Sequence, residues 1–199
     1  MSAPDPNMVL NTIWSGTDRR GGATMVYAVL DGARNGAIHT EIRKSGFQFE
    51  CLYRGELDPD LADAAPYVVR LEAEMPFTHW LIGKGWGDSW GIFLVAAASL
   101  RDVRQHLRKF LMVYGPDGKP LYFRYYDPRV LRVYLPTCNA EELGMFFGPV
   151  QCFMAENDDP RTLLRFTTAS GSLQQQNVPV AARESGVSGE APTHKNAVK

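Results

Sequence analysis

One pentapeptide in the chain has the spacing of a catalytic serine motif. The segment Gly87-Asp88-Ser89-Trp90-Gly91 fits Gly-x-Ser-x-Gly, in which the serine attacks a carbonyl group and a histidine, here His79 or His106, accepts its proton. That motif needs a strand before the serine and a helix after it, whereas glycines precede Ser89 and a strand-like run follows it. The order favours a glycine-rich loop that leads into a strand. A serine hydrolase that uses this segment stays open as the alternative function.

Motifs for cofactor or metal chemistry are incomplete. The segment Gly83-Lys84-Gly85-Trp86-Gly87 is rich in glycine but lacks the Gly-Lys-Ser/Thr ending of a phosphate-binding loop. His39-Thr40-Glu41 has no Pro-Cys-x-x-Cys partner of the kind that zinc deaminases require, and Asp158-Asp159 precedes a proline, as in a solvated turn. The sequence also contains no Cys-x-x-Cys and no His-Glu-x-x-His. We therefore expect no catalytic residue, no metal and no cofactor.

The remaining candidate functional residues are arginines and tyrosines. Arg101, Arg104 and Arg108 recur at helical spacing, and the run 123–129 reads Phe-Arg-Tyr-Tyr-Asp-Pro-Arg. The guanidinium group is a planar fork that pairs with carboxylates and stacks on aromatic rings, so it suits both internal ion pairs and protein interfaces. Two interpretations stay open: Arg124 or Arg108 pairs with Asp127 and fixes the fold, or the arginines form a surface that binds a partner.

The elements that must position these residues alternate between strands and helices. Ser99 followed by Asp102 predicts a helix start, and apolar residues at helical spacing extend that helix to about 111. Two β-rich runs around 115–119, which contains Pro-Asp-Gly, predict a hairpin. Further strands are expected at residues 25–30, 49–53, 66–71, 91–97, 150–155 and 163–167. The pattern predicts an α/β or α+β fold with a mixed β-sheet flanked by helices.

The composition is that of an ordinary globular protein. Of 199 residues, 45% are hydrophobic and 22% are charged, and the formal net charge is −1, which argues against binding to nucleic acid or anionic membranes. A nucleic-acid-binding module that uses the arginine stripe is a third interpretation. The first eleven residues lack a secretory pattern, and the longest apolar run, Ile92–Ala98, is too short to span a membrane. We expect a soluble cytoplasmic protein.

The distribution of aromatic residues suggests the domain limits. Every aromatic side chain lies at or before Phe166, and the residues after it are mainly small or polar. Such a segment cannot bury enough apolar area to offset its ordering entropy. We expect an N-terminal lead-in at 1–22, a single compact domain at 23–167 and a flexible C-terminal tail at 168–199. In the lead-in, Val9, Leu10, Ile13 and Trp14 could dock as one helical turn.

Several blocks together resemble the DUF4123 family. They are His106–Leu111, Pro116–Lys119, the run Phe123–Leu131 and Phe146–Val150, in that order, with Ala65–Val68 and an early strand that ends at Asp31 before them. The resemblance covers roughly residues 26–156. It implies a non-enzymatic cytoplasmic adaptor chaperone of bacterial type VI secretion, which holds an effector toxin and helps to load it onto a VgrG or PAAR spike.

On this interpretation, we expect the arginines and nearby aromatic residues to bind the partner protein, since both types are enriched at interface hot spots. The residues expected to bind it are Arg101, Arg104, Arg108, Arg124, Arg129, Tyr122, Tyr126 and Trp86. The grip would combine aromatic anchors with arginines, with strand addition at an exposed sheet edge as a further possibility. No nucleic acid, membrane or small-molecule substrate is expected.

Overall fold

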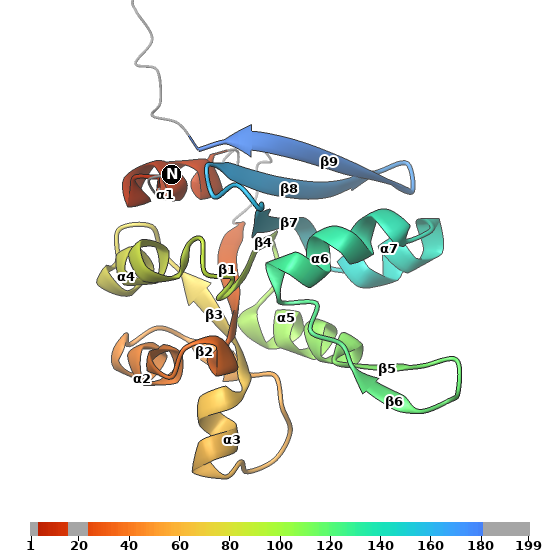
Figure 1. Ribbon diagram of the computed structural model, residues 1–199, viewed down its shortest axis with the longest axis horizontal. Helices are drawn as coiled ribbons and strands as arrows, with labels where there is room; N and C mark the ends of the chain where they lie inside the picture. The colour runs from red at the N-terminus through yellow and green to blue at the C-terminus, as the bar shows by residue number, and fades with distance from the viewer. Residues whose placement is uncertain (1–3, 16–23, 181–199) are drawn as a thin grey trace, which may run out of the picture.

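The protein is a three-layer structure in which helices cover both faces of one seven-stranded sheet (Figure 1). The computed structural model describes residues 4–15 and 24–180. The strand order in the sheet is β2-β3-β1-β4-β7-β8-β9. The strands are β1 (Met25–Asp31), β2 (Phe49–Cys51), β3 (Pro66–Leu71), β4 (Gly91–Ala96), β7 (Val150–Glu156), β8 (Thr162–Ala169) and β9 (Ser172–Pro179). The helices are α1 (Pro6–Trp14), α2 (Ala37–Lys44), α3 (Pro59–Ala64), α4 (Pro76–Gly85), α5 (Leu100–Leu107), α6 (Pro128–Tyr134) and α7 (Ala140–Phe147).

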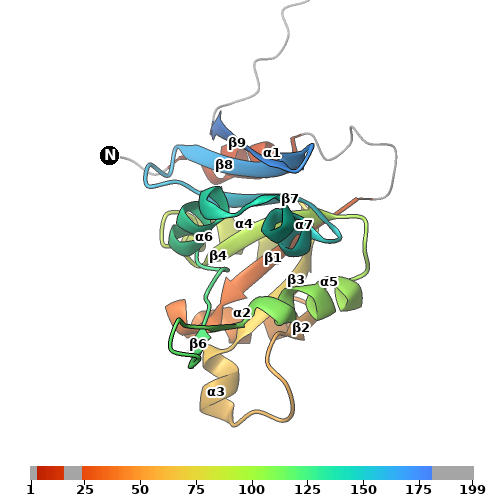
Figure 2. The same cartoon turned by 90° about the vertical axis from the view of Figure 1, so that its right-hand side faces the viewer.

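The interior strand β1 explains the layering. Because side chains alternate along a strand, Val26, Ala28 and Leu30 point to one face while Tyr27 and Val29 point to the other. The first set packs in a core with buried residues of α1, α2 and α4, and the second set packs with α5, α6 and α7. Figure 2 shows α5, α6 and α7 lying over the sheet on this second face. Residues 25–30 of β1 contain no charged side chain, as expected of a strand that is buried on both faces.

The expected fold class, a sheet flanked by helices, is confirmed, but the direction of the strands differs from the expectation. Each pair of neighbouring strands in the described sheet is antiparallel, so the parallel part of the predicted mixed sheet is absent there. The connection from β3 to β4 through α4 passes across β1, and both strands then run antiparallel to β1. Hydrophobic patterning identifies buried strands but does not set their relative direction.

Capping groups define the start of the helices as the sequence indicates. The Ser99 side chain accepts a hydrogen bond from the Asp102 backbone N–H, and its hydroxyl donates to the Asp102 carboxylate at 2.6 Å. This geometry confirms the helix start predicted at Ser99. After Leu107 the helix tightens into a 3₁₀ turn at Arg108–Phe110, so the predicted helix to 111 is found in two parts.

Both ends of the described chain are more ordered than expected. Val9, Leu10 and Ile13 are buried in α1, so the predicted lead-in contributes a nine-residue helix to the core. The expected tail from residue 168 is wrong at its start, because β8 runs to Ala169 and β9 pairs along its length with β8. Backbone pairing orders this strand although it carries few large apolar groups. The remainder of the expected tail, 181–199, lies outside the described residues.

A second, two-stranded sheet stands apart from the main one. It is the predicted hairpin, with strands β5 (Met112–Tyr114) and β6 (Pro120–Tyr122), and Gly118 in its loop has a left-handed φ of 72°. The β-rich run at residues 121–126 predicts a second strand that extends to 126, but β6 ends at Tyr122, where the chain turns toward α6. The hairpin projects beside α5, and every residue of its two strands is exposed (Figure 1). None of the helices at residues 4–15 and 24–180 combines the length and the hydrophobicity that a membrane-spanning segment requires.

Candidate protein-binding groove

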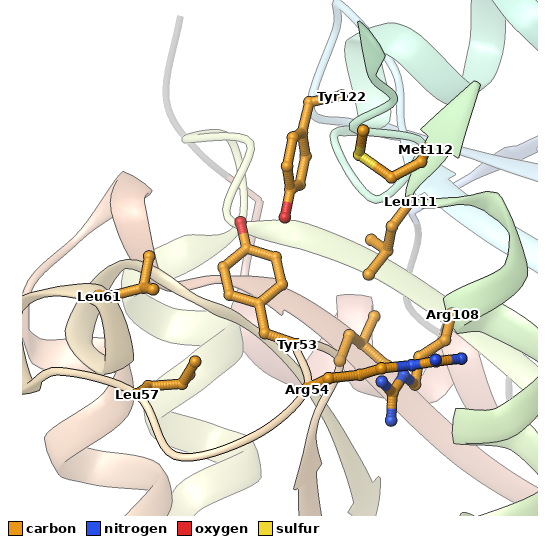
Figure 3. A pocket seen from close by; sticks show the side chains of 9 residues that line it. Tyr53, Arg54, Leu57, Leu61, Arg108, Leu111, Met112 and Tyr122 are labelled. Atoms are coloured by element: carbon orange, nitrogen blue, oxygen red, sulfur yellow. The ribbon is translucent and has the colours of Figure 1, made fainter. Parts of the chain in front are cut away.

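An open groove lies between the β5–β6 hairpin and the segment that follows β2. It has a volume of about 550 Å³ and is lined by Leu52, Tyr53, Arg54, Leu57, Leu61, Arg108, Leu111, Met112 and Tyr122. Figure 3 shows Leu57 and Leu61 on one side and Leu111, Met112 and Tyr122 on the other. One wall therefore comes from α3 and the loop before it, and the other from the end of α5 and the hairpin. We call this feature the groove.

The groove is apolar yet exposed. Leu61 is 45% exposed, Met112 is 42% exposed and Tyr122 is 55% exposed, whereas Leu52 and Leu111 are buried beneath them. The hairpin continues the apolar surface with Tyr114 and Leu121, which are also exposed. Leaving such side chains in water forgoes hydrophobic free energy, and clustered exposed apolar groups mark interaction sites.

Two tyrosines join the walls of the groove. The rings of Tyr53 and Tyr122 meet edge to face with their centroids 5.7 Å apart, and their hydroxyl ends point toward each other (Figure 3). Burial and a hydrogen bond with Tyr122 raise the pKa of Tyr53 to about 12, so its hydroxyl stays protonated. The contact fixes the hairpin relative to the loop after β2 and presents polar groups in an otherwise apolar groove.

One end of the groove carries unbalanced positive charge. Arg54 and Arg108 line it, and neither pairs with a carboxylate in the described part of the chain. Partial burial and the neighbouring Arg104 and Arg54 lower the pKa of Arg108. Arg104 is itself engaged, because its Nε donates to the Cys51 carbonyl at 2.7 Å and lies 3.4 Å from Glu50. The uncompensated guanidinium groups suit an acidic partner.

A buried aspartate lies behind the groove at the end of β1. Asp31 accepts a hydrogen bond from the Ala33 N–H, while its Oδ2 is buried with no hydrogen-bond partner among the described residues. Burial raises the pKa of Asp31, although the Ala33 N–H and Arg124, whose guanidinium lies 3.7 Å from the carboxylate, act in the opposite direction. Tyr126 is buried nearby, and burial together with Asp31 raises its pKa. We interpret the cluster of Asp31, Arg124 and Tyr126 as a structural one that stabilises the end of strand β1.

The predicted ion pair of Asp127 is wrong in its partner. Asp127 pairs with Arg129, which donates from Nε at 2.9 Å and from a second nitrogen at 2.5 Å, rather than with Arg108 or Arg124. Burial alone would raise the pKa of Asp127, but the hydrogen bonds from Arg129 hold it below its ordinary value. Asp127 also accepts from the Arg129 N–H and so caps α6. Asp127 pairs with Arg129 because Arg129 lies only two residues after it, within reach of the carboxylate that caps α6.

The structure brings only some of the predicted binding residues together. Arg108 and Tyr122 line the groove, and Arg104 lies one helical turn from Arg108 on α5. Arg101 is exposed one turn further along the same helix. Trp86 lies on the opposite face of the sheet, where its Nε1 donates to the Pro160 carbonyl at 2.7 Å and its ring packs on Phe93.

Sequence reasoning missed much of the groove. Arg54, Leu57, Leu61 and Met112 were not expected to contribute. The sequence did contain one signal for these residues. Two leucines lie within the acidic segment 56–63, Glu-Leu-Asp-Pro-Asp-Leu-Ala-Asp, which has no apolar pattern that would bury them in a core. An apolar residue in a charged segment that is too short to form a buried element is a candidate for a contact surface.

The serine motif is held by a buried carboxylate. The backbone N–H groups of Gly87 and Ser89 donate to the two Glu156 oxygens at 2.5 and 2.7 Å, and Ser89 has a left-handed φ of 56°. The segment lies between α4 and β4, so a helix precedes it and a strand follows, the reverse of a nucleophile elbow. The His106 ring interacts with the Phe146 carbonyl on the other face of the sheet, and no described contact joins Ser89 to either candidate histidine.

Metal chemistry has no cluster of ligands in the part of the chain described. No group of three or more His, Cys, Asp or Glu side chains is placed to hold an ion among residues 4–15 and 24–180. No disulfide joins Cys51, Cys138 or Cys152.

Fold and groove define a helix-flanked antiparallel sheet protein whose conspicuous surface feature is a concave, partly apolar and basic site. The model of one protein family, described as "Domain of unknown function (DUF4123)", matches residues 26–144. The match covers more than half of the chain, so the protein belongs to this family. No curated protein and no solved structure matches the chain. The matched region contains the entire groove but ends before β7, β8 and β9.

Proposed function

We propose that the protein is a non-enzymatic adaptor chaperone of type VI secretion. It binds an effector toxin in the cytoplasm and helps to load it onto a VgrG or PAAR spike. The observation that carries the proposal is the groove, an exposed apolar site with two unpaired arginines inside the matched family region. The secretion role comes from the resemblance of the sequence to adaptor chaperones of this family.

The groove suggests how a client would be held. An apolar side chain of the effector would insert between Leu61 on one wall and Met112 and Tyr122 on the other, and an acidic group would pair with Arg54 or Arg108. Each buried apolar side chain contributes about 1.5–3 kcal/mol, and hydrogen bonds to charged groups add about 1.5–3 kcal/mol. Binding to the folded client also stabilises it by mass action. No bond is made or broken in this mechanism.

The test is client capture with a charge reversal in the groove. The full chain is co-expressed with the toxin encoded beside it, and the amount of toxin retained is measured for wild type and for Arg54→Glu/Arg108→Glu. We expect the variant to lose at least about tenfold in affinity, because two favourable contacts become repulsive. The matched control is Arg43→Glu/Lys84→Glu, which reverses two exposed charges on α2 and α4 that do not line the groove.

The outcomes separate the site from the function. Toxin that is retained equally by wild type and groove variant contradicts the groove as the binding site. Failure of wild type to retain any neighbouring toxin or spike component contradicts the adaptor function. Ester hydrolysis by purified protein that disappears in Ser89→Ala would replace the proposal with the hydrolase alternative.

A further inference from the structure

The last strand of the sheet has an unprotected edge. β9 ends the strand order, and within the described residues no element pairs with its outer side. It is eight residues long, and most of its side chains are exposed. Figure 1 shows it along the top of the molecule with the β8–β9 hairpin extending toward α7. The residues after Arg165 carry no charged or histidine side chain until Arg183, so charge does not protect this edge.

The opposite edge of the same sheet is protected. β2 has only three residues, and Arg104 from α5 donates to the Cys51 carbonyl there at 2.7 Å. Short length and a covering charged side chain are the ordinary ways in which proteins block edge-to-edge pairing. Neither is present at β9, and its one edge-blocking residue, Pro179, stands at the end of the strand, so the two edges differ in their capacity to accept another strand.

The register of the hairpin identifies the backbone groups that face outward. Ser170 and Gly171 both have left-handed φ angles, 50° and 74°, as in a two-residue type I′ turn, which makes Ala169 and Ser172 a hydrogen-bonded pair. The Val180 N–H bonds to the Arg161 carbonyl at 2.8 Å, which fits the same alternation. Even-numbered residues of β9 therefore bond to β8. The outward groups belong to Leu173, Gln175 and Asn177, and Pro179, which lacks an N–H, also falls in the outward row.

We infer that this edge pairs with β9 of a second copy of the chain. In an antiparallel pair related by a two-fold axis at Gln175, Leu173 faces Asn177 of the other copy and Gln175 faces itself. This register pairs every outward N–H and C=O group of the three residues. Moving the axis one pair in one direction places outward groups opposite the hairpin turn, and moving it in the other places an outward C=O opposite Pro179, which has no N–H to donate.

Side chains agree with the same register. Gln174 of one copy lies opposite Gln176 of the other, and the paired Gln175 amides face each other, so amide groups can hydrogen-bond across the strands. No like charges meet, because the strand has none. A strand pair of this size without a large apolar core gives a weak association in the micromolar range. The inference does not depend on the proposed function, since β9 lies outside the family match and the groove.

The experiment measures the oligomeric state of the full chain by sedimentation velocity over a range of micromolar concentrations. Wild type is expected to form a reversible dimer. Gln175→Lys and Gln175→Glu each place like charges directly opposite and should weaken the dimer about tenfold or more, whereas an equimolar mixture of the two variants should restore it. Gln176→Lys is the matched control, because its partner is an uncharged glutamine and the dimer should persist. Thermal unfolding of each variant verifies its fold.

A backbone variant provides a second test. Gln175→Pro removes an outward N–H without breaking the ladder to β8, and it should also weaken the dimer. A wild-type monomer, a dimer insensitive to position 175, or a mixture that stays monomeric overturns the inference. A monomer in which Gln175→Pro lowers toxin capture would assign the edge to a client strand. A monomer in which it lowers the unfolding temperature would assign the edge to residues 181–199 of the same chain, and both results also overturn pairing with a second copy.

Discussion

At the scale of single residues, burial sets the behaviour of the acidic groups more than their sequence neighbours do. Asp31 and Glu156 are both buried, and burial raises the pKa of each carboxyl group. The hydrogen bonds that each carboxylate accepts from backbone N–H groups lower the pKa by less than burial raises it. Asp127, which is equally well buried, has its pKa lowered because Arg129 forms a two-pronged pair with it. A charged partner at hydrogen-bond distance therefore decides the sign of the shift.

The pH dependence of stability follows from these signs. A folded-state pKa above the ordinary value of 3.8 means that the folded protein binds the Asp31 proton more tightly than the unfolded chain does. The stability contributed by protonated Asp31 is present below pH 3.8 and is lost as the pH rises through the raised pKa. We expect Asp31→Asn to lose less stability than wild type as the pH rises above that value, measured by urea unfolding.

Asp127 provides the control, because its contribution to stability depends on pH in the opposite direction. Because the pKa of Asp127 is lowered, its contribution to stability is present above its ordinary pKa and is lost as the pH falls. Asp127→Asn keeps an oxygen to cap α6 but loses the charged pair with Arg129, so it should flatten the acid side of the profile. Identical pH profiles for Asp31→Asn and wild type would contradict the assigned role of Asp31.

The sequence blocks that carry the family resemblance mostly hold the fold together. His106 interacts with the Phe146 carbonyl at 2.7 Å, and a Cβ added at Gly148 would lie 2.3 Å from the His106 ring. The Tyr125 hydroxyl donates to the Leu107 carbonyl at 3.0 Å. These blocks meet in one core, which explains why order and spacing along the chain identify the family. Only part of the groove falls within them.

At the scale of elements, sequence patterns predicted the strands and the capped helix but not their arrangement. The apolar run of β1 and the Ser99 cap are local features, and the structure has both. Strand direction, the pairing of β9 with β8 and the approach of α3 to the hairpin depend on contacts between distant residues. Since Leu57 and Leu61 form the groove wall only after that approach, their role is not encoded in their local spacing.

The β5–β6 hairpin illustrates an element that is free to serve binding. Its side chains are exposed, so replacing them removes little buried area. We expect Tyr114→Ser/Leu121→Ser/Tyr122→Ser to change the free energy of unfolding by no more than about 2–3 kcal/mol, since surface changes are within ±0.5 kcal/mol each and the lost Tyr53–Tyr122 ring contact adds about 0.5–1.5 kcal/mol. The same variant should weaken client binding at least about tenfold, because it removes apolar anchors.

The control for the hairpin variant must replace apolar residues that are exposed outside the groove and the hairpin. Val133 on α6 and Met145 on α7 are exposed to a similar degree outside the groove, so Val133→Ser/Met145→Ser is the matched control. Calorimetric titration with the client would measure both variants. Equal loss of binding in the two would show that general surface hydrophobicity, rather than the hairpin, holds the client.

At the scale of the whole molecule, charge is balanced overall but not at the groove. The net charge of −1 gives no long-range attraction for an acidic partner, yet Arg54 and Arg108 concentrate positive charge at one end of the site. Short-range pairing should therefore dominate, and its contribution depends on ionic strength. This distribution also separates the proposed protein partner from a nucleic acid, whose phosphate backbone requires many basic contacts.

Client binding should accordingly weaken only moderately with salt. Raising the ionic strength from about 0.1 M to about 1 M shortens the Debye length from about 10 Å to about 3 Å, and two exposed ion pairs contribute about 0.2–1 kcal/mol each, so the affinity should fall several-fold. Arg54→Gln/Arg108→Gln should bind more weakly at low salt and converge with wild type at high salt, while Arg43→Gln/Lys84→Gln keeps the wild-type slope. Calorimetry across the salt series measures both. A groove variant that keeps the full slope would place the ionic contacts elsewhere, and tight, steeply salt-dependent binding to duplex DNA would favour a nucleic-acid partner.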